Sequence, residues 1–275
     1  MTKEIALEQP GALAPMPFSV EEMVEDASLG GKVNLSDIAV PYLYILQTNS
    51  PQVNPDHAKY VPDAKPGQLY LSNLEKVFDG RNTGLIIVPC YYERLVTEWL
   101  PRSAGGGLVA SHDPEADILK TAKTVESEGK TIQVLPNGHQ IIETAYHYVL
   151  VQDPESKVWY QAIMPMKSTA LKASRRMNST ISTTMIPGTS NRAPRFLFKW
   201  KMTSIKEQKD DYVWSSPKLE QLDMVTADVY RAAKDYAIVS AKGLLRRAAA
   251  EFDQDEVSSP APRASNRGPN EEIPF

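Results

Sequence analysis

The chain has 275 residues, of which 42% are hydrophobic and 23% are charged, and its formal net charge is −4. This composition is typical of a soluble globular protein with enough apolar residues for a sizeable core. No apolar run approaches the ~18 residues of a helical membrane span, so we expect no membrane partner. The first residues lack the basic start and apolar stretch of a secretory signal. Cys90 is the single cysteine and can form no internal disulfide, which favours a reducing compartment and a cytoplasmic protein.

In chain order, the sequence predicts many short strands and a few helices. Enrichment in β-branched and aromatic residues indicates the strands, and residues 136–138 and 153–156 have the composition of hairpin turns. Strands are expected at 68–71, 84–89, 91–99, 131–135, 140–144, 146–152, 157–164, 195–203 and 211–214. Helical segments are expected at 20–24, 117–127, 168–177 and 217–252, with a glycine-rich loop at 105–107.

Two of the predicted helices carry specific signals. Ser168 is placed as the N-cap of the helix 168–177, whose basic residues gather toward its C-terminal end. The long helix begins at Pro217, after the possible cap Ser216. Its expected buried face keeps a spacing near 3.6 residues and consists of Val225, Val229, Ala232, Ala233, Tyr236 and Val239.

The sequence therefore predicts an α+β fold with a mostly antiparallel β core, flanking helices, a long C-terminal helix and a disordered acidic tail. One form that such a core takes is a small β-barrel of the oligonucleotide-binding kind. Residues 1–34 are expected to form a flexible acidic segment, and residues 35–257 the core. Residues 258–275 combine a linker with an acidic tip. The linker 258–269 has no large apolar residue and cannot offset the entropy of ordering.

Charge is distributed very unevenly along the chain. Residues 156–206 contain ten basic residues and no aspartate or glutamate. The other 224 residues contain 20 basic and 34 acidic residues, a net charge of −14. Solvated faces of ordinary proteins mix both signs, so this segregation indicates an anionic partner.

Aromatic residues interleave with the basic residues of this segment. Single-stranded nucleic acid needs cations along its phosphates and flat rings on which its bases stack. In a strand over 195–201, the aromatic side chains share one face and the basic side chains share the other. The same alternation also fits a strand whose aromatic face lies in the core. The candidate DNA-binding residues are Lys157, Trp159, Tyr160, Lys167, Lys172, Arg175, Arg176, Arg192, Arg195, Phe196, Phe198, Lys199, Trp200 and Lys201.

No motif for catalysis or metal binding is present. The four histidines, His57, His112, His139 and His147, are scattered and lack metal-ligand spacing. The glycine loop is not followed by the Lys-Ser/Thr of a phosphate-binding loop, and there is no Gly-x-Ser-x-Gly nucleophile elbow. We therefore expect a protein that is not an enzyme and that carries no cofactor and no metal.

The last five residues are Glu271, Glu272, Ile273, Pro274 and Phe275, and they follow the linker. They closely resemble the acidic tip of bacterial and phage single-stranded DNA-binding proteins, which ends in acids followed by Ile-Pro-Phe. In that family the tip docks replication and repair enzymes, so the resemblance implies this role for these five residues. A terminal Phe offers a ring and a carboxylate together to a partner's pocket. The resemblance does not extend to residues 1–250 and implies no fold.

The combined expectation is a phage single-stranded DNA-binding protein that coats DNA and recruits replication or repair proteins through its tip. In that case its location is the cytoplasm of the bacterial host. A recombination mediator or annealing protein is an alternative, with the long C-terminal helix as a homo-oligomer interface. A nuclease and a virion structural protein are weaker alternatives.

Overall fold

In a computed structural model, residues 19–26, 29, 40–101, 104, 107–127, 130–209 and 212–243 are described. The chain divides into two units, residues 1–38 and 39–275. In the first unit, helix α1 (Val20–Asp26) begins with a capping box. The Glu22 amide donates to Ser19 Oγ and the Ser19 amide donates to Glu22 Oε2, so two free amides of the first turn are satisfied. The predicted helical turn at 20–24 is thereby confirmed.

The second unit is built on a large antiparallel sheet. Its path runs β11–β10–β4–β8–β7–β6, with β5 added beside β4 and β9 added beside β8. Its strands are β4 (Leu85–Trp99), β5 (Leu108–His112), β6 (Lys123–Ser127), β7 (Lys130–Val134), β8 (Gln140–Gln152), β9 (Trp159–Lys167), β10 (Phe198–Lys209) and β11 (Tyr212–Met224). Short 3-10 helices occur as well, among them η2 (Pro51–Val53), η4 (Asp117–Thr121) and η5 (Ser168–Ala170).

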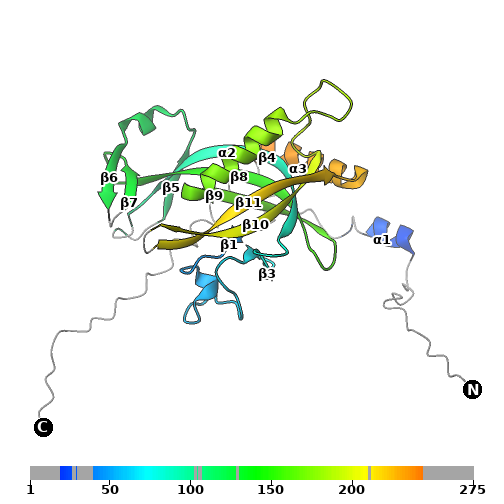
Figure 1. The fold of residues 1–275 in the computed structure, drawn as a ribbon, viewed down its shortest axis with the longest axis horizontal. Helices are drawn as coiled ribbons and strands as arrows, with labels where there is room; N and C mark the ends of the chain where they lie inside the picture. The colour runs from blue at the N-terminus through cyan, green and yellow to red at the C-terminus, as the bar shows by residue number, and fades with distance from the viewer. Residues whose placement is uncertain are drawn as a thin grey trace, which may run out of the picture. The chain divides into compact units, whose positions relative to one another are not determined.

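Strands β4 and β8 form the central pair and are paired along their whole lengths (Figure 1). The sequence predicted two strands in place of β4, separated near Cys90. The structure has one strand with a bulge between Pro89 and Tyr91, which is how a central strand accommodates a proline. Likewise, the strands predicted at 140–144 and 146–152 are one continuous strand, β8.

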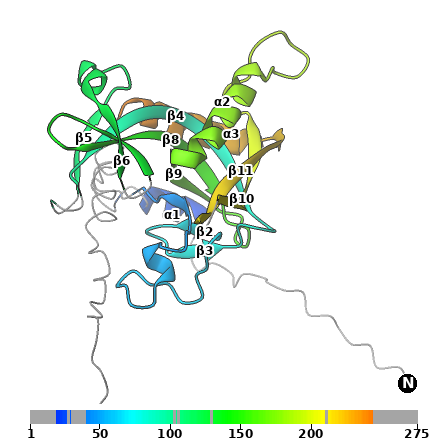
Figure 2. The ribbon, with the colours of Figure 1, turned by 60° about the vertical axis from the view of Figure 1, so that its left-hand side comes forward.

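A three-stranded sheet lies beneath the large sheet (Figure 2). It consists of β1 (Leu43–Ile45), β2 (Leu69–Leu71) and β3 (Lys76–Phe78). The Ile163 amide donates to the Pro41 carbonyl on one side, and the Ser204 amide donates to the Gly80 carbonyl on the other. Despite these links, the strand ladders of the described residues do not close into a barrel.

The main core lies between the two sheets and helix α2 (Leu171–Thr183). Alternate residues of the central strands, such as Ile87 and Val149, enter this core together with Met177 of α2. The other face of the sheet is covered by helix α3 (Ala227–Ala241), where Tyr236 packs edge-on against Tyr148 with ring centroids 6.2 Å apart. The large sheet therefore carries one helix on each face.

The α+β class with a mostly antiparallel β core and flanking helices is confirmed. The helix predicted over 217–252 is wrong for its first part, because residues 217–224 belong to strand β11 and the helix α3 begins at Ala227. Pairing along all of β10 outweighs the helical periodicity, and Pro217 is tolerated because β11 is an edge strand. On α3 the buried residues are Ala233, Tyr236 and Ser240, whereas Ala232 is exposed.

Two smaller predictions also need correction. The helix expected at 117–127 is a 3-10 turn followed by strand β6, which pairs with β7 in a regular antiparallel ladder. Ser168 does not cap α2, because it lies in the preceding 3-10 turn with φ +50° and the N-cap position is Ala170. Residues 244–275, including the predicted linker, lie outside the described residues. Among the described helices, none is long and apolar enough to span a membrane.

Candidate nucleic-acid interface

Helix α2 is held by two polar contacts one turn apart, a buried one to strand β8 and a partly buried one to Arg195, which precedes strand β10. His147 Nε2 and Ser174 Oγ are 2.8 Å apart, and both residues are almost completely buried. One turn further, Arg195 Nη2 donates to Asn178 Oδ1 over 2.7 Å, and its guanidinium lies 5.3 Å from the centre of the Tyr92 ring. Because Ser174 and Asn178 share one face of the helix, the opposite face points away from the sheet.

Burial shifts the pKa of each group in this attachment. It lowers the pKa of His147 to about 3, and the nearby Arg195 charge lowers it further. It also lowers the pKa of Arg195 to about 10 and raises the pKa of the adjacent Cys90 thiol to about 12. His147 is therefore a neutral, buried hydrogen-bonding group, and Cys90 is an unreactive buried thiol.

A cleft of about 220 Å³ separates α2 from strand β11. Its lining combines polar and charged side chains with apolar ones such as Met177 and Leu219. Three cations line it, Lys172 and Arg176 from α2 and Lys218 from β11. Lys172 and Arg176 are exposed and make no ion pair within the described residues. Two residues of the predicted basic patch, Lys172 and Arg176, therefore line the cleft, whereas the third, Arg175, does not.

Acidic side chains from outside the acid-free segment also reach this surface. Glu220 lies 2.6 Å from Lys218, and this hydrogen bond, with the charges of Lys218, Lys201 and Arg176, lowers the pKa of Glu220. Glu143 lies 3.3 Å from Arg94 and 3.8 Å from Arg175. Acidic and basic residues that are separated in the sequence are thus partly brought together by the fold. Three cations, Lys172, Arg176 and Lys218, nevertheless line the cleft with two carboxylates, Glu207 and Glu220. Lys201 lies opposite Glu220 on the β10–β11 hairpin.

The first part of the basic segment lies at a different site. Lys157, Trp159 and Tyr160 belong to the turn and strand that follow β8, where the Lys157 ammonium donates to the Pro154 carbonyl. Lys76 is paired there with Asp153 and lies 5.4 Å from the Tyr160 ring centre. The hydrogen bond from Lys76 holds the pKa of Asp153 at about 2. This end of the segment therefore lies beside an ion pair, that of Lys76 with Asp153, whose members come from outside the segment.

The remaining candidates are divided among packing sites. Trp200 is only 3% exposed and belongs to the main core, so it is not available for base stacking in the folded protein. Phe196 packs edge-on against Tyr230 of α3, with ring centroids 5.0 Å apart. Lys167 Nζ lies 5.2 Å from the Trp99 ring centre. Arg192 is exposed and forms a single β-bridge with Met185.

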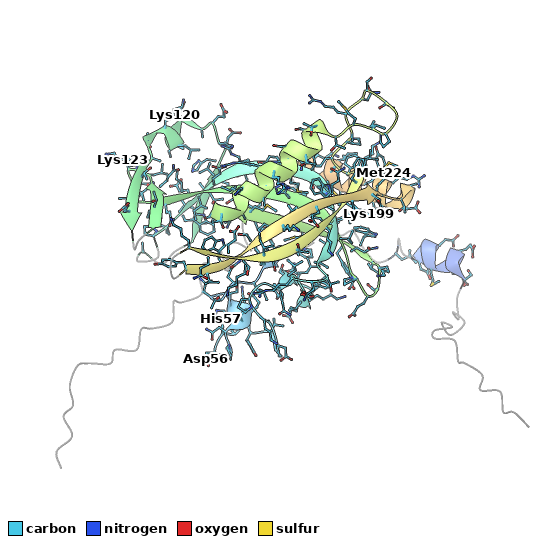
Figure 3. The ribbon with its side chains drawn as sticks, viewed as in Figure 1. Asp56, His57, Lys120, Lys123, Lys199 and Met224 are labelled. Carbon is cyan, nitrogen blue, oxygen red and sulfur yellow. The ribbon has the colours of Figure 1, made fainter. Side chains whose placement is uncertain are left out.

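Only part of the predicted set therefore meets at one place. Phe198 and Lys199 begin strand β10 and are half-buried, and Lys199 lies near Met224 at the end of β11 (Figure 3). Lys120 and Lys123 lie at the far end of this unit (Figure 3). The predicted residues that line the cleft are Lys172 and Arg176, and Lys201 lies opposite the cleft residue Glu220 on the hairpin.

Two residues near the cleft were missed by the sequence reasoning. Lys218 lies beyond the acid-free segment, in a stretch predicted as helix, and Trp214 was assigned to a short strand without a role. The alternation of residues 214, 216, 218 and 220 was the available signal, because these positions share one face of a strand. Residues 271–275, the predicted protein-docking tip, lie outside the described residues.

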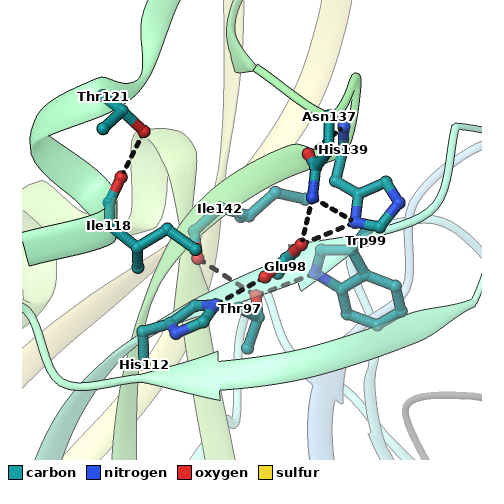
Figure 4. A network of polar contacts seen from close by, with 9 residues as sticks. All are labelled: Thr97, Glu98, Trp99, His112, Ile118, Thr121, Asn137, His139 and Ile142. Atoms are coloured by element: carbon teal, nitrogen blue, oxygen red, sulfur yellow. Dashed lines mark hydrogen bonds and ion pairs between the residues drawn. The ribbon is translucent and has the colours of Figure 1, made fainter. Parts of the chain in front are cut away.

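A second polar cluster lies at the opposite end of the sheet (Figure 4). The carboxylate of Glu98, whose side chain is 6% exposed, lies 2.6 Å from His112 Nε2 and 2.5 Å from His139 Nδ1, and it accepts from Asn137 over 3.1 Å. Burial alone would raise the pKa of Glu98, but these hydrogen bonds keep it below its usual value. Two histidines that look isolated in the sequence thus share one carboxylate. Within the described ranges, no three side chains of metal-ligating type are arranged to hold a metal ion.

Residues 11–244 match the family described as Pam3 phage gp34-like protein. The chain belongs to this family. The match covers the two sheets, α2 and α3, and it supports the expected phage origin as far as the name of the family goes. Searches of curated proteins and of solved structures returned no match.

Proposed function

We propose that this protein binds single-stranded DNA in the cleft between α2 and β11 and recruits replication or repair proteins through residues 271–275. The observation that carries the proposal is the cleft itself, where the exposed cations Lys172 and Arg176, which make no ion pair within the described residues, lie beside apolar side chains. Phosphates need the cations, and unstacked bases need an apolar surface. A duplex presents its bases only by their edges, so apolar side chains in the cleft favour a single strand over a duplex.

The rest of the molecule is consistent with a binding protein. Helix α2 is fixed by a buried contact of Ser174 and a partly buried contact of Asn178, so its basic face keeps a defined orientation toward β11. The cations are exposed and therefore hydrated when no ligand is bound. Binding is expected to depend strongly on salt, because each phosphate contact releases a counterion.

The proposed role of the tip rests on its sequence. Residues 271–275 have the acid-Ile-Pro-Phe pattern of the tips that dock replication and repair enzymes. In a phage protein of this kind, the tip would recruit replication enzymes to DNA that the core has coated. Such a tip acts separately from the DNA-binding core, so its removal should not abolish DNA binding.

The test is fluorescence anisotropy of labelled dT oligonucleotides with the full chain and with a variant truncated after Ser258. Measurements at several salt concentrations, with duplex DNA as competitor, separate phosphate contacts from preference for a single strand. We expect salt-dependent binding to the single strand that both proteins retain and that duplex DNA competes poorly. Absence of binding in both proteins would overturn the proposal, and equal affinity for duplex would overturn its single-strand part.

A further inference from the structure

Strands β10 and β11 form a long hairpin with one face turned away from the main core. Trp200 and Met202 of β10 are buried and point into the main core. The residues that alternate with them, and their partners on β11, therefore lie on the opposite face. The cross-strand pairs of this face are Lys201 with Glu220, Thr203 with Lys218, Ile205 with Ser216, and Glu207 with Trp214. The face therefore continues from the cations of the cleft to an aromatic residue.

The Trp214 indole is held in a fixed orientation at the end of the cleft. Its Nε1 donates to Glu207 Oε2 over 2.7 Å and to Ser216 Oγ over 3.1 Å. Ser216 Oγ in turn donates to the same carboxylate oxygen over 2.7 Å. Glu207 and Ser216 both line the cleft, so the polar edge of the indole is attached to the cleft wall.

The other tryptophans are less suited to contact a ligand at this cleft. Trp99 and Trp200 are 4% and 3% exposed and lie in packed interiors. Trp159 is half-buried but lies at the β8–β9 end, beside the paired Lys76 and Asp153. Trp214 is half-buried too, and it is the described tryptophan that is bonded to residues of the cleft.

We propose that Trp214 is a base-stacking residue and that Glu207 is the positioning residue that holds its indole; this rests on the proposed function. Glu207 makes no ion pair within the described residues, so its negative charge repels phosphate from that end of the cleft. The phosphates then follow Lys172, Arg176 and Lys218, and a base lies against the indole. The ligand is a nucleobase of a single strand, taken without strong sequence preference because every base has a stacking face.

The first test compares Trp214→Ala and Trp214→Phe with Trp159→Ala in binding to a labelled single strand. Loss of one stacking contact is expected to weaken binding by about tenfold in Trp214→Ala and by less in Trp214→Phe, which keeps a ring. The dependence of affinity on salt should stay unchanged, because no phosphate contact is removed. Thermal unfolding of each variant checks that the fold is intact, and Trp159→Ala should bind like the wild type.

The second test uses tryptophan fluorescence and examines Glu207. Stacking of a base should quench the emission of wild-type protein, and Trp214→Phe should lose most of that quenching. Glu207→Gln keeps an oxygen that accepts from the indole N–H, so it should retain affinity and quenching, whereas Glu207→Ala should lose part of both. Rescue by glutamine distinguishes a positioning role from a need for negative charge.

The outcomes separate this inference from the proposed function. If the wild type binds and Trp214→Ala binds equally well with equal quenching, the inference is overturned and the proposed function stands. Loss of quenching in a Trp159 variant in place of Trp214 would overturn the inference as well. If the wild type binds no single strand, the proposed function fails and the inference fails with it.

Discussion

The two ends of the basic segment have the same kind of sequence and very different surroundings. At the α2 end, Lys172 and Arg176 are exposed beside a cleft and make no ion pair within the described residues. At the β8–β9 end, Trp159 and Tyr160 lie beside an ion pair of Lys76 with Asp153, which come from outside the segment. The comparison teaches that an acid-free sequence does not fix the charge of a surface, because the fold brings acids to both ends, Asp153 to one and Glu207 and Glu220 to the other. The ends differ in that exposed cations without an ion pair in the described part of the chain line a cleft at the α2 end.

The largest expected effect concerns Trp200, which the sequence placed among the stacking aromatics. Trp200→Ala should lower the free energy of unfolding by about 3–5 kcal/mol, because it removes a large buried side chain from the main core. Urea denaturation measures this change. The affinity of the remaining folded protein for single-stranded DNA should stay the same. If Trp200→Ala kept wild-type stability and lost affinity for single-stranded DNA, Trp200 would be a DNA-contacting residue and not a core residue.

The comparison of the two ends is tested directly by charge reversal. Lys172→Glu with Arg176→Glu should weaken single-strand binding by at least about tenfold, since two phosphate contacts become repulsions. Each phosphate contact contributes about 0.7 to the slope of the logarithm of the binding constant against the logarithm of the salt concentration. Loss of two contacts should therefore make this slope shallower by about 1.4. Lys157→Glu at the other end is the control and should change little. The account is contradicted if Lys157→Glu has the larger effect.

The attachment of α2 predicts a pH dependence of stability. His147 has a pKa of about 3 in the folded protein, against 6.5 ordinarily. Between these values the unfolded chain binds a proton that the folded protein does not, so stability present above pH 6.5 is lost as the pH falls toward 3. In this interval the free energy of unfolding changes by up to about 1.4 kcal/mol per pH unit because of His147.

The measurement is urea denaturation between pH 7 and pH 5, where most carboxyl groups remain ionised. His147→Gln should reduce the slope in this interval, since glutamine does not titrate. Lys157→Glu, which leaves the buried contact intact, is a suitable control. An unchanged slope in His147→Gln would show that His147 is not the buried neutral group described above.

The smallest expected effect concerns Cys90. Burial raises its pKa to about 12, so very little thiolate exists near neutral pH. An alkylating reagent should leave the native protein unmodified, as followed by mass spectrometry, and single-strand binding should not change. Protein unfolded in urea is the positive control. Rapid alkylation of the native protein would mean that the bulge of β4 opens readily.

Local sequence signals were sufficient for much of the fold. The hairpins at 136–138 and 153–156 were predicted because their turn residues allow few other conformations. Residues 217–224 were predicted as helix because a short apolar pattern is compatible with either a helix or a strand. Pairing with β10 makes this segment a strand. The bulge that joins 84–89 to 91–99 was missed because Pro89 looks like the end of a strand.

The candidate site was predictable only in part, for related reasons. The spacing of Lys172, Arg175 and Arg176 places these residues together on one helix whatever the fold. By contrast, the alternation over 195–201 is equally compatible with an aromatic face in the core or on the surface, and Trp200 lies in the core. Lys218 and Trp214 join the site through the β10–β11 hairpin, which the local sequence does not specify.

The central claim is that single-stranded DNA lies in the cleft between α2 and β11, and cross-linking tests it most directly. A photoreactive single strand is bound to the full chain, cross-linked, and the attached peptides are identified by mass spectrometry. We predict cross-links to residues 169–177 and 201–220, at or near Lys172, Arg176 and Lys218. Cross-links confined to residues 157–160 or to α3, or none at all, would contradict the account.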